Sequence, residues 1–146
     1  MEIIIDTNIL VAIFLRGNRQ SYSYQLLAKC LAGEFKPQIS NALFNEYQEV
    51  LYRDSVMASS IYSVKERRLV LEELYFRSEW SNIYYLWRPN LPDEGDNHLI
   101  ELAIASGTKY IVTMNHRDFR GELKTGIHIV KPKEMLNEVK NGNTNL

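Results

Sequence analysis

The chain has 146 residues and a formal net charge of −1, and 45% of its residues are hydrophobic. This length predicts one domain whose hydrophobic core needs no disulfide or structural metal. Cys30 is the single cysteine, which excludes an internal disulfide and a cysteine-based zinc site and fits a reducing cytoplasm. No apolar run is long enough for a membrane span, and no signal peptide is predicted. The near-neutral charge excludes a strong overall preference for nucleic acid, but not a local basic patch.

The first fifteen residues, MEIIIDTNILVAIFL, place a carboxylate between two apolar runs. The isoleucines at 3–5 predict a short strand, and the lack of polar alternation predicts that both of its faces are covered, as in a parallel sheet. Residues 9–15 predict about two turns of helix. Open α/β sheets bind ligands at the carboxyl ends of their strands, so Asp6 lies at a candidate site. The alternative is that Asp6 only caps the helix, because aspartate is a common N-cap residue.

The rest of the chain alternates predicted helices and strands. Apolar spacing predicts helices at 18–33, 41–52, 65–77, 96–106 and 133–139, and β-rich runs predict strands at 35–39, 83–86, 110–113 and 127–130. Pro37 favours an edge position or an irregular start for the second strand. The apolar stripe of the 65–77 helix is expected to comprise Leu69, Leu71, Leu74 and Tyr75. These units predict an α/β fold, a single domain with a mainly parallel central sheet of four or five strands flanked by helices.

Several acidic and amide side chains fall at comparable places in this arrangement. Asp6 follows the first strand, and Asn115 and Asp118 follow the 110–113 strand. If these two strands are neighbours, their carboxyl ends bring the three side chains together. Asp96 opens the 96–106 helix and Glu46 lies in the 41–52 helix, after the expected N-cap Ser40.

Carboxylates that converge in this way repel one another unless a hard divalent cation lies between them. Mg²⁺ accepts such oxygen ligands, and a bound metal can activate water for the hydrolysis of a phosphodiester. The sequence shows no Ser–His–Asp pattern, no GxGxxG and no GxxxxGK[ST], so no other route to an activated nucleophile is conspicuous. Glu46 could instead be an ordinary solvated helix residue. His98 and His116 lie near the same segments, where isolated histidines are usually bystanders.

Three elements taken together resemble the PIN-domain family: the opening IIIDTNIL, the S-x(5)-E of Ser40 and Glu46, and the block DEGDNHLIELAIASGTKYIVTMNHRDF. They look most like the toxin-type PIN proteins of bacteria and archaea, and the resemblance covers residues 1 to about 138. A hydrophobic strand followed by DTN is moderately specific alone. The elements D-x(6)-A and T-x-N-x-x-DF, which follow in order, make the resemblance strong. The expected organisation is a PIN-like nuclease domain at 1–138 and a flexible C-terminal tail at 139–146.

The resemblance implies a Mg²⁺- or Mn²⁺-dependent endoribonuclease that cleaves single-stranded RNA in the cytoplasm, as the toxin half of a toxin–antitoxin pair. The acidic positions of the family correspond here to Asp6, Glu46, Asp96 and Asp118. The expected metal ligands among them are Asp6, Asp96 and Asp118. The residues expected to orient these ligands or a phosphate are Asn8, Thr113 and Asn115. Many close relatives carry aspartate where this chain has Asn115, and the amide lowers the charge available to a second metal.

Two other classes of function compete with this interpretation. A PIN-like fold that binds RNA or a protein without cutting would also fit Asn115 and the acidic pI. A haloacid-dehalogenase-like phosphatase, suggested by the strand before Asp6, requires a second aspartate where this chain has Asn8, and is therefore largely excluded. The many tyrosines and tryptophans and the low net charge predict a homodimer, and the family resemblance adds an antitoxin protein as a partner. No association with a membrane is expected.

Overall fold

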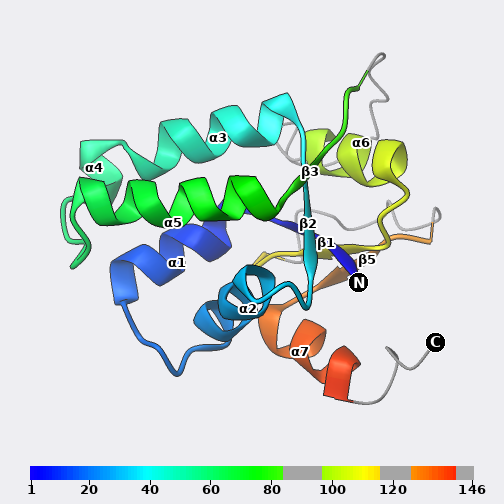
Figure 1. Ribbon diagram of the computed structural model, residues 1–146, viewed down its shortest axis with the longest axis horizontal. Helices are drawn as coiled ribbons and strands as arrows, with labels where there is room; N and C mark the ends of the chain where they lie inside the picture. Colours follow the sequence, from blue (N-terminus) through cyan, green and yellow to red (C-terminus); the bar gives the residue numbers. More distant parts are fainter. Residues whose placement is uncertain (84–96, 116–125, 141–146) are drawn as a thin grey trace.

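The computed structural model describes residues 1–83, 97–115 and 126–140, and Figure 1 shows how their elements are arranged. In chain order these elements are β1 (Glu2–Ile5), α1 (Thr7–Arg16), α2 (Tyr22–Leu31), β2 (Lys36–Ile39), α3 (Asn41–Leu51), α4 (Asp54–Met57), α5 (Val64–Arg77), β3 (Glu79–Trp80), α6 (Asn97–Ser106), β4 (Tyr110–Val112), β5 (His128–Val130) and α7 (Pro132–Lys140). None of the described helices is long and apolar enough to cross a membrane. Residues 141–146 of the expected tail lie outside the described part.

The described strands form one sheet in the order β3-β2-β1-β4-β5, and every neighbouring pair is parallel. The predicted α/β fold with a parallel sheet of four or five strands is confirmed. β1 is the central strand, with β2 on one side and β4 on the other. The first strand and the 110–113 strand are therefore neighbours, which is the condition under which Asp6 is expected to meet the residues that follow β4. Because all the strands run the same way, their carboxyl ends meet at one edge of the sheet.

Both faces of β1 are covered, as the run of isoleucines predicts. Ile3, Ile4 and Ile5 are at most 1% exposed, although successive side chains of a strand point to opposite faces. The neighbouring strand β2 contacts both α5 and α6. Figure 1 shows these two helices on opposite sides of β2. The sheet is thus enclosed by helices at its centre, and the start of α1 is anchored to a fully buried strand.

The third strand lies earlier than predicted. β3 follows α5 directly, and Glu79 pairs with Gln38 of β2. Ile83, where a strand is expected, is not in one, and residues 84–86 lie outside the described part. Because α5 already packs against β2, the chain reaches the open side of β2 within two residues of the end of the helix. β2 is consequently an interior strand, and Pro37 is accommodated because pairing with β3 starts only at Gln38.

The buried stripe of α5 also differs from the expected one. Leu69 is 57% exposed, whereas Arg67 is only 5% exposed and lies on the same face as Leu71 and Leu74. The Arg67 guanidinium donates hydrogen bonds to the carbonyl oxygens of Leu51, over 3.2 Å, and Tyr62, over 2.6 Å. Arg67 thereby ties α5 to the end of α3. Apolar periodicity does not predict the burial of Arg67, because arginine is not an apolar residue.

Candidate active site

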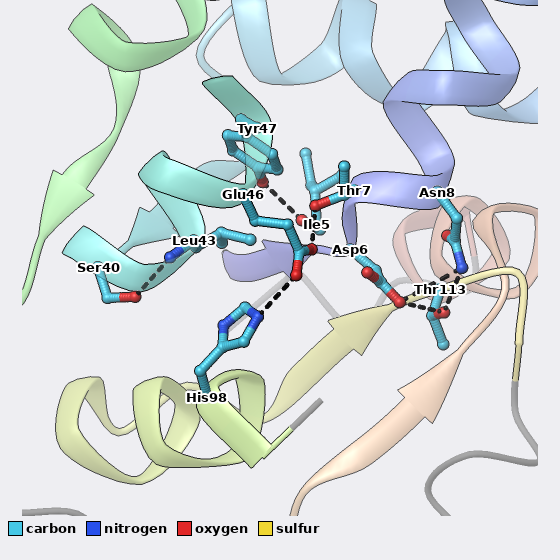
Figure 2. A network of polar contacts seen from close by, with 10 residues as sticks. All are labelled: Ile5, Asp6, Thr7, Asn8, Ser40, Leu43, Glu46, Tyr47, His98 and Thr113. Carbon is cyan, nitrogen blue, oxygen red and sulfur yellow. Dashed lines mark hydrogen bonds and ion pairs between the residues drawn. The ribbon is translucent and has the colours of Figure 1, made fainter. Parts of the chain in front are cut away.

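Asp6 lies directly after β1, at the N-cap position of α1, but its side chain does not cap the helix. Its Oδ2 instead accepts hydrogen bonds from the Thr113 hydroxyl, over 2.8 Å, and from the Asn8 amide, over 3.3 Å. Thr113 follows β4, so the contact joins the carboxyl ends of two neighbouring strands (Figure 2). Only 6% of Asp6 is exposed. Helix capping therefore does not account for this buried carboxylate.

Asn8 and Thr113 connect the turn after β1 to the turn after β4. Besides its contact with Asp6, the Asn8 side-chain nitrogen lies 3.2 Å from the Thr113 hydroxyl, and its oxygen accepts a hydrogen bond from the backbone N–H of Met114. The backbone N–H of Asn115 donates to the same hydroxyl over 3.1 Å. The hydroxyl hydrogen of Thr113 is consequently directed at Asp6. Residues that the sequence predicted as orienting groups thus lie around the Asp6 carboxylate.

Glu46 projects from α3 toward the same edge of the sheet, and each of its oxygens has a partner. The hydroxyl of Thr7, which begins α1, donates to Oε1, and Nε2 of His98, on α6, lies 3.1 Å from Oε2. Figure 2 shows the Glu46 carboxylate between these two groups and beside Asp6. The Glu46 side chain is 31% exposed and that of His98 is 17% exposed. Glu46 is therefore a fixed, half-buried residue and not a freely solvated one.

The two carboxylates differ in their electrostatic environment. Burial raises the pKa of Asp6, and the nearby charge of Glu46 raises it further, while the hydrogen bonds from Thr113 and the Thr7 backbone partly offset this. Burial also acts to raise the pKa of Glu46. The hydrogen bonds from His98 and Thr7 outweigh burial there, so the pKa of Glu46 is lowered. Without a cation, Asp6 is the carboxylate whose charge is less well compensated.

A buried tyrosine, Tyr47, lies next to the residue that precedes Asp6. The Tyr47 hydroxyl donates to the carbonyl oxygen of Ile5 over 2.5 Å, at the end of β1 (Figure 2). Burial first, and then the charge of Asp6, raise the pKa of Tyr47 well above its ordinary value. The hydroxyl therefore stays protonated and serves as a donor. It thereby anchors the end of β1, next to Asp6, to α3.

The structure brings together Asp6, Asn8, Thr113 and Asn115 at one edge of the sheet, with Glu46 beside Asp6. Asp96 and Asp118, the other two expected acidic residues, lie outside the described residues, as does His116. Within residues 1–83, 97–115 and 126–140, no three His, Cys, Asp or Glu side chains form a group that could hold a metal ion. His98 contacts Glu46, although an isolated histidine at this place is expected to be a bystander. Its position two residues after Asp96 was the available signal, but its partner Glu46 is 52 residues away.

Comparison with known proteins adds one finding. A family model described as PIN domain matches residues 2–117 of the chain. The match includes all the site residues described above as well as Asp96, and it ends one residue before Asp118. No curated protein matches the sequence.

Proposed function

Because the chain belongs to the PIN-domain family, we propose that it is a metal-dependent endoribonuclease that cleaves single-stranded RNA. PIN domains are in general metal-dependent nucleases. The observation that carries the proposal for this chain is the buried carboxylate of Asp6. It is held by Thr113 and Asn8 at the carboxyl edge of the sheet, where ligands bind in open α/β folds, and it performs no capping role.

The chemistry of the donors fits Mg²⁺ or Mn²⁺. Asp6 offers a hard oxygen ligand. Burial first, and then the nearby charge of Glu46, raise the pKa of Asp6, and a dication would offset both effects. Asp6, Asp96 and Asp118 are the proposed ligands. When bound, the cation would supply positive charge to the phosphate oxygens and lower the pKa of water.

The remaining residues have proposed roles in positioning. Glu46, whose two oxygens are held by Thr7 and His98, keeps lone pairs that can orient the attacking water. Asn8 and Thr113 fix the Asp6 carboxylate, and Asn115 lies beside them, near the path of the phosphate. In the reaction the water oxygen forms a bond to phosphorus as the bond to the leaving ribose oxygen breaks. A fixed Glu46 lowers the entropic barrier of this step.

The biological setting belongs to the same proposal. The nuclease domain spans residues 1–138, acts in the cytoplasm, and is the toxin half of a toxin–antitoxin pair, as its sequence pattern suggests. Its proposed protein partners are an antitoxin and a second copy of the chain. Several large apolar side chains on and just before α5 support self-association because they are exposed: Ile61, Val64 and Leu69.

Cleavage of a fluorophore-labelled single-stranded RNA tests the proposed function. The wild-type protein should cleave with Mg²⁺ or Mn²⁺ and be inactive in EDTA, and Asp6→Asn should abolish cleavage. Asp54→Asn makes the same chemical change at an exposed aspartate of α4 and should leave the rate unchanged. Metal-independent cleavage, or full activity of Asp6→Asn, would contradict the proposal.

Binding without cleavage is the second candidate function. The residue that favours it is Asn115, an amide at a position where the resemblance to toxin-type PIN proteins implies a carboxylate in many relatives. In that case the wild-type protein would retain RNA or a protein partner but cleave no RNA at any metal concentration. The same assay, together with a gel-shift measurement in EDTA, separates the two candidates.

A further inference from the structure

A groove of about 440 Å³ lies between α3 and α5, outside the site described above. Figure 1 shows the two helices running alongside each other. The residues that line the groove are Phe44 and Gln48 from α3, Tyr52 directly after that helix, and Arg68, Leu71, Glu72 and Tyr75 from α5. We refer to it as the aromatic groove. Phe44 and Gln48 are four positions apart and lie on one face of α3, whereas Glu46 projects from another.

The aromatic rings of the groove form a continuous surface that leads to β3. The centroids of Phe44 and Tyr75 are 4.9 Å apart, and Trp80 lies 5.4 Å from Phe44 and 6.4 Å from Tyr75. Trp80 is 47% exposed. Exposed aromatic faces that remain partly open to solvent are the surfaces on which unpaired bases stack.

Polar groups accompany these rings. The side-chain oxygen of Gln48 accepts a hydrogen bond from the Tyr75 hydroxyl over 2.8 Å, which fixes the amide so that its nitrogen can donate to another group. Arg68 and Glu72 are exposed at the rim. An amide, a guanidinium and a carboxylate can pair with the edges of a base, and Arg68 can also reach a phosphate.

The position of Trp80 connects the groove with the proposed active site. Trp80 ends β3, two strands from β1, and all the strands are parallel. Neighbouring strands are about 4.8 Å apart, so the end of β3 at Trp80 and the end of β1 at Ile5, the residue before Asp6, are about 10 Å apart at the same edge of the sheet. Trp80 and the proposed active site therefore share one edge of the molecule.

We propose that the aromatic groove binds an unpaired base of the RNA substrate, a few nucleotides from the cleaved bond. The inference rests on the proposed function for the identity of the ligand. The inference adds to that function a second contact site for the RNA substrate, outside the proposed active site. The groove supplies stacking through Phe44 and Tyr75, which Trp80 extends, and hydrogen bonding through Gln48, Arg68 and Glu72.

Binding is tested without cleavage. In a Trp87→Phe protein held in EDTA, Trp80 is the only tryptophan and reports on the groove by its fluorescence. A single-stranded hexaribonucleotide should quench this signal, and ribose 5-phosphate, which has no base, should not. Phe44→Leu, which keeps the apolar volume but removes the ring, should weaken the apparent affinity about fivefold or more. Phe76→Leu makes the same change at an 81% exposed position outside the groove and should have no effect.

Kinetics provide the second measurement. Phe44→Leu should raise KM for RNA about fivefold or more and leave kcat nearly unchanged, because stacking far from the reacting phosphate contributes to binding only. The inference is wrong if Phe44→Leu and Phe76→Leu have equal KM values and are quenched equally. If the wild-type protein still cleaves RNA in that case, the proposed function is unaffected. Quenching by the oligonucleotide without any cleavage supports base binding and contradicts the proposed function. A loss of dimer in Phe44→Leu with unchanged quenching also overturns the inference, since the groove would then be covered by a second copy.

Discussion

Nε2 of His98 lies 3.1 Å from Oε2 of Glu46, while the hydroxyl of Thr7 holds the other oxygen of the same carboxylate. Three helices, α1, α3 and α6, thus meet at one side chain. The lowered pKa of Glu46 reflects these two donors against the opposing effect of burial. The position of this carboxylate is set by packing between helices and not by α3 alone.

Removing the hydroxyl that fixes Glu46 should impair catalysis. We expect Thr7→Val to lower kcat about 10- to 100-fold, because an unheld carboxylate samples unproductive orientations. Thr7→Ser keeps the hydroxyl and should retain most of the activity. The measurement is single-turnover cleavage of labelled RNA. Equal rates for the two variants would show that the contact with Glu46 has no part in the reaction.

Asp6→Asn should stabilise the metal-free protein while it abolishes cleavage. The buried charge and its repulsion by Glu46 destabilise the fold, and the neutral amide still accepts a hydrogen bond from Thr113. A gain of about 1 kcal/mol corresponds to a rise of about 2–4 °C in Tm for a domain of this size. Thermal unfolding in EDTA measures the change, with Asp54→Asn as the matched control. A clear drop in Tm would argue against a repulsive pair.

Asn115→Asp should lower the concentration of Mg²⁺ or Mn²⁺ needed for half-maximal cleavage. A carboxylate stabilises a nearby dication more than an amide does, and Asn115 lies beside the Thr113–Asp6 contact. A metal titration of RNA cleavage compares the variant with the wild type. If the midpoints agree while Asp118→Asn is inactive, Asp118 supplies that charge and Asn115 is a structural residue.

Arg67→Met should destabilise the fold by about 2–4 kcal/mol. The buried guanidinium donates to the carbonyl oxygens of Leu51 and Tyr62, and methionine would fill the space but leave both without this donor. Arg68→Met changes the adjacent, exposed arginine and should alter stability by less than about 0.5 kcal/mol. Urea unfolding of both variants provides the comparison. Similar midpoints would mean that the contacts of Arg67 contribute little.

The thiol of Cys30 should resist alkylation in the folded protein. Burial raises its pKa from an ordinary value of 9.0 to about 12, so at pH 9 the native thiol stays protonated while an unfolded chain is about half ionised. Stability should accordingly fall as the pH rises from about 9 toward 12, because only the unfolded state releases the proton at first. Iodoacetamide labelling at pH 9, with and without urea, measures the protection. Rapid native labelling would contradict the buried position of Cys30.

The sequence predicts the parts of the site that depend on local pattern. Three consecutive isoleucines identify β1 because only a strand covered on both faces buries all of them, and the next residue, Asp6, then follows its carboxyl end. The pairing of β1 with β4, which the sequence offers only as a condition, brings Thr113 to Asp6. The identity of β1 and the place of Asp6 thus require only short-range signals, whereas the order of the strands in the sheet comes from the structure.

Other features have no local signal. The contact of Glu46 with His98 depends on how α3 and α6 pack against each other. The two residues are 52 positions apart in the sequence, so no local pattern connects them. Arg67 is buried, where it donates hydrogen bonds to the carbonyl oxygens of Leu51 and Tyr62. A pattern of apolar residues gives no indication of such backbone acceptors. Trp80 lies in β3 because the end of α5 is close to the open side of β2. Residues 83–86 are richer in β-forming side chains, so the sequence alone favours a strand there instead.

The parallel register of β1 and β4 has a consequence for the chain during synthesis. Ile5 is opposite Val112, and only this alignment sets the next residues, Asp6 and Thr113, within hydrogen-bonding distance. Because successive side chains of a strand point to opposite faces, a slip of one residue would turn Thr113 away from Asp6. A nascent chain therefore cannot assemble this edge of the sheet until residue 113 has left the ribosome. The proposed ribonuclease activity is accordingly absent for most of the translation of the chain.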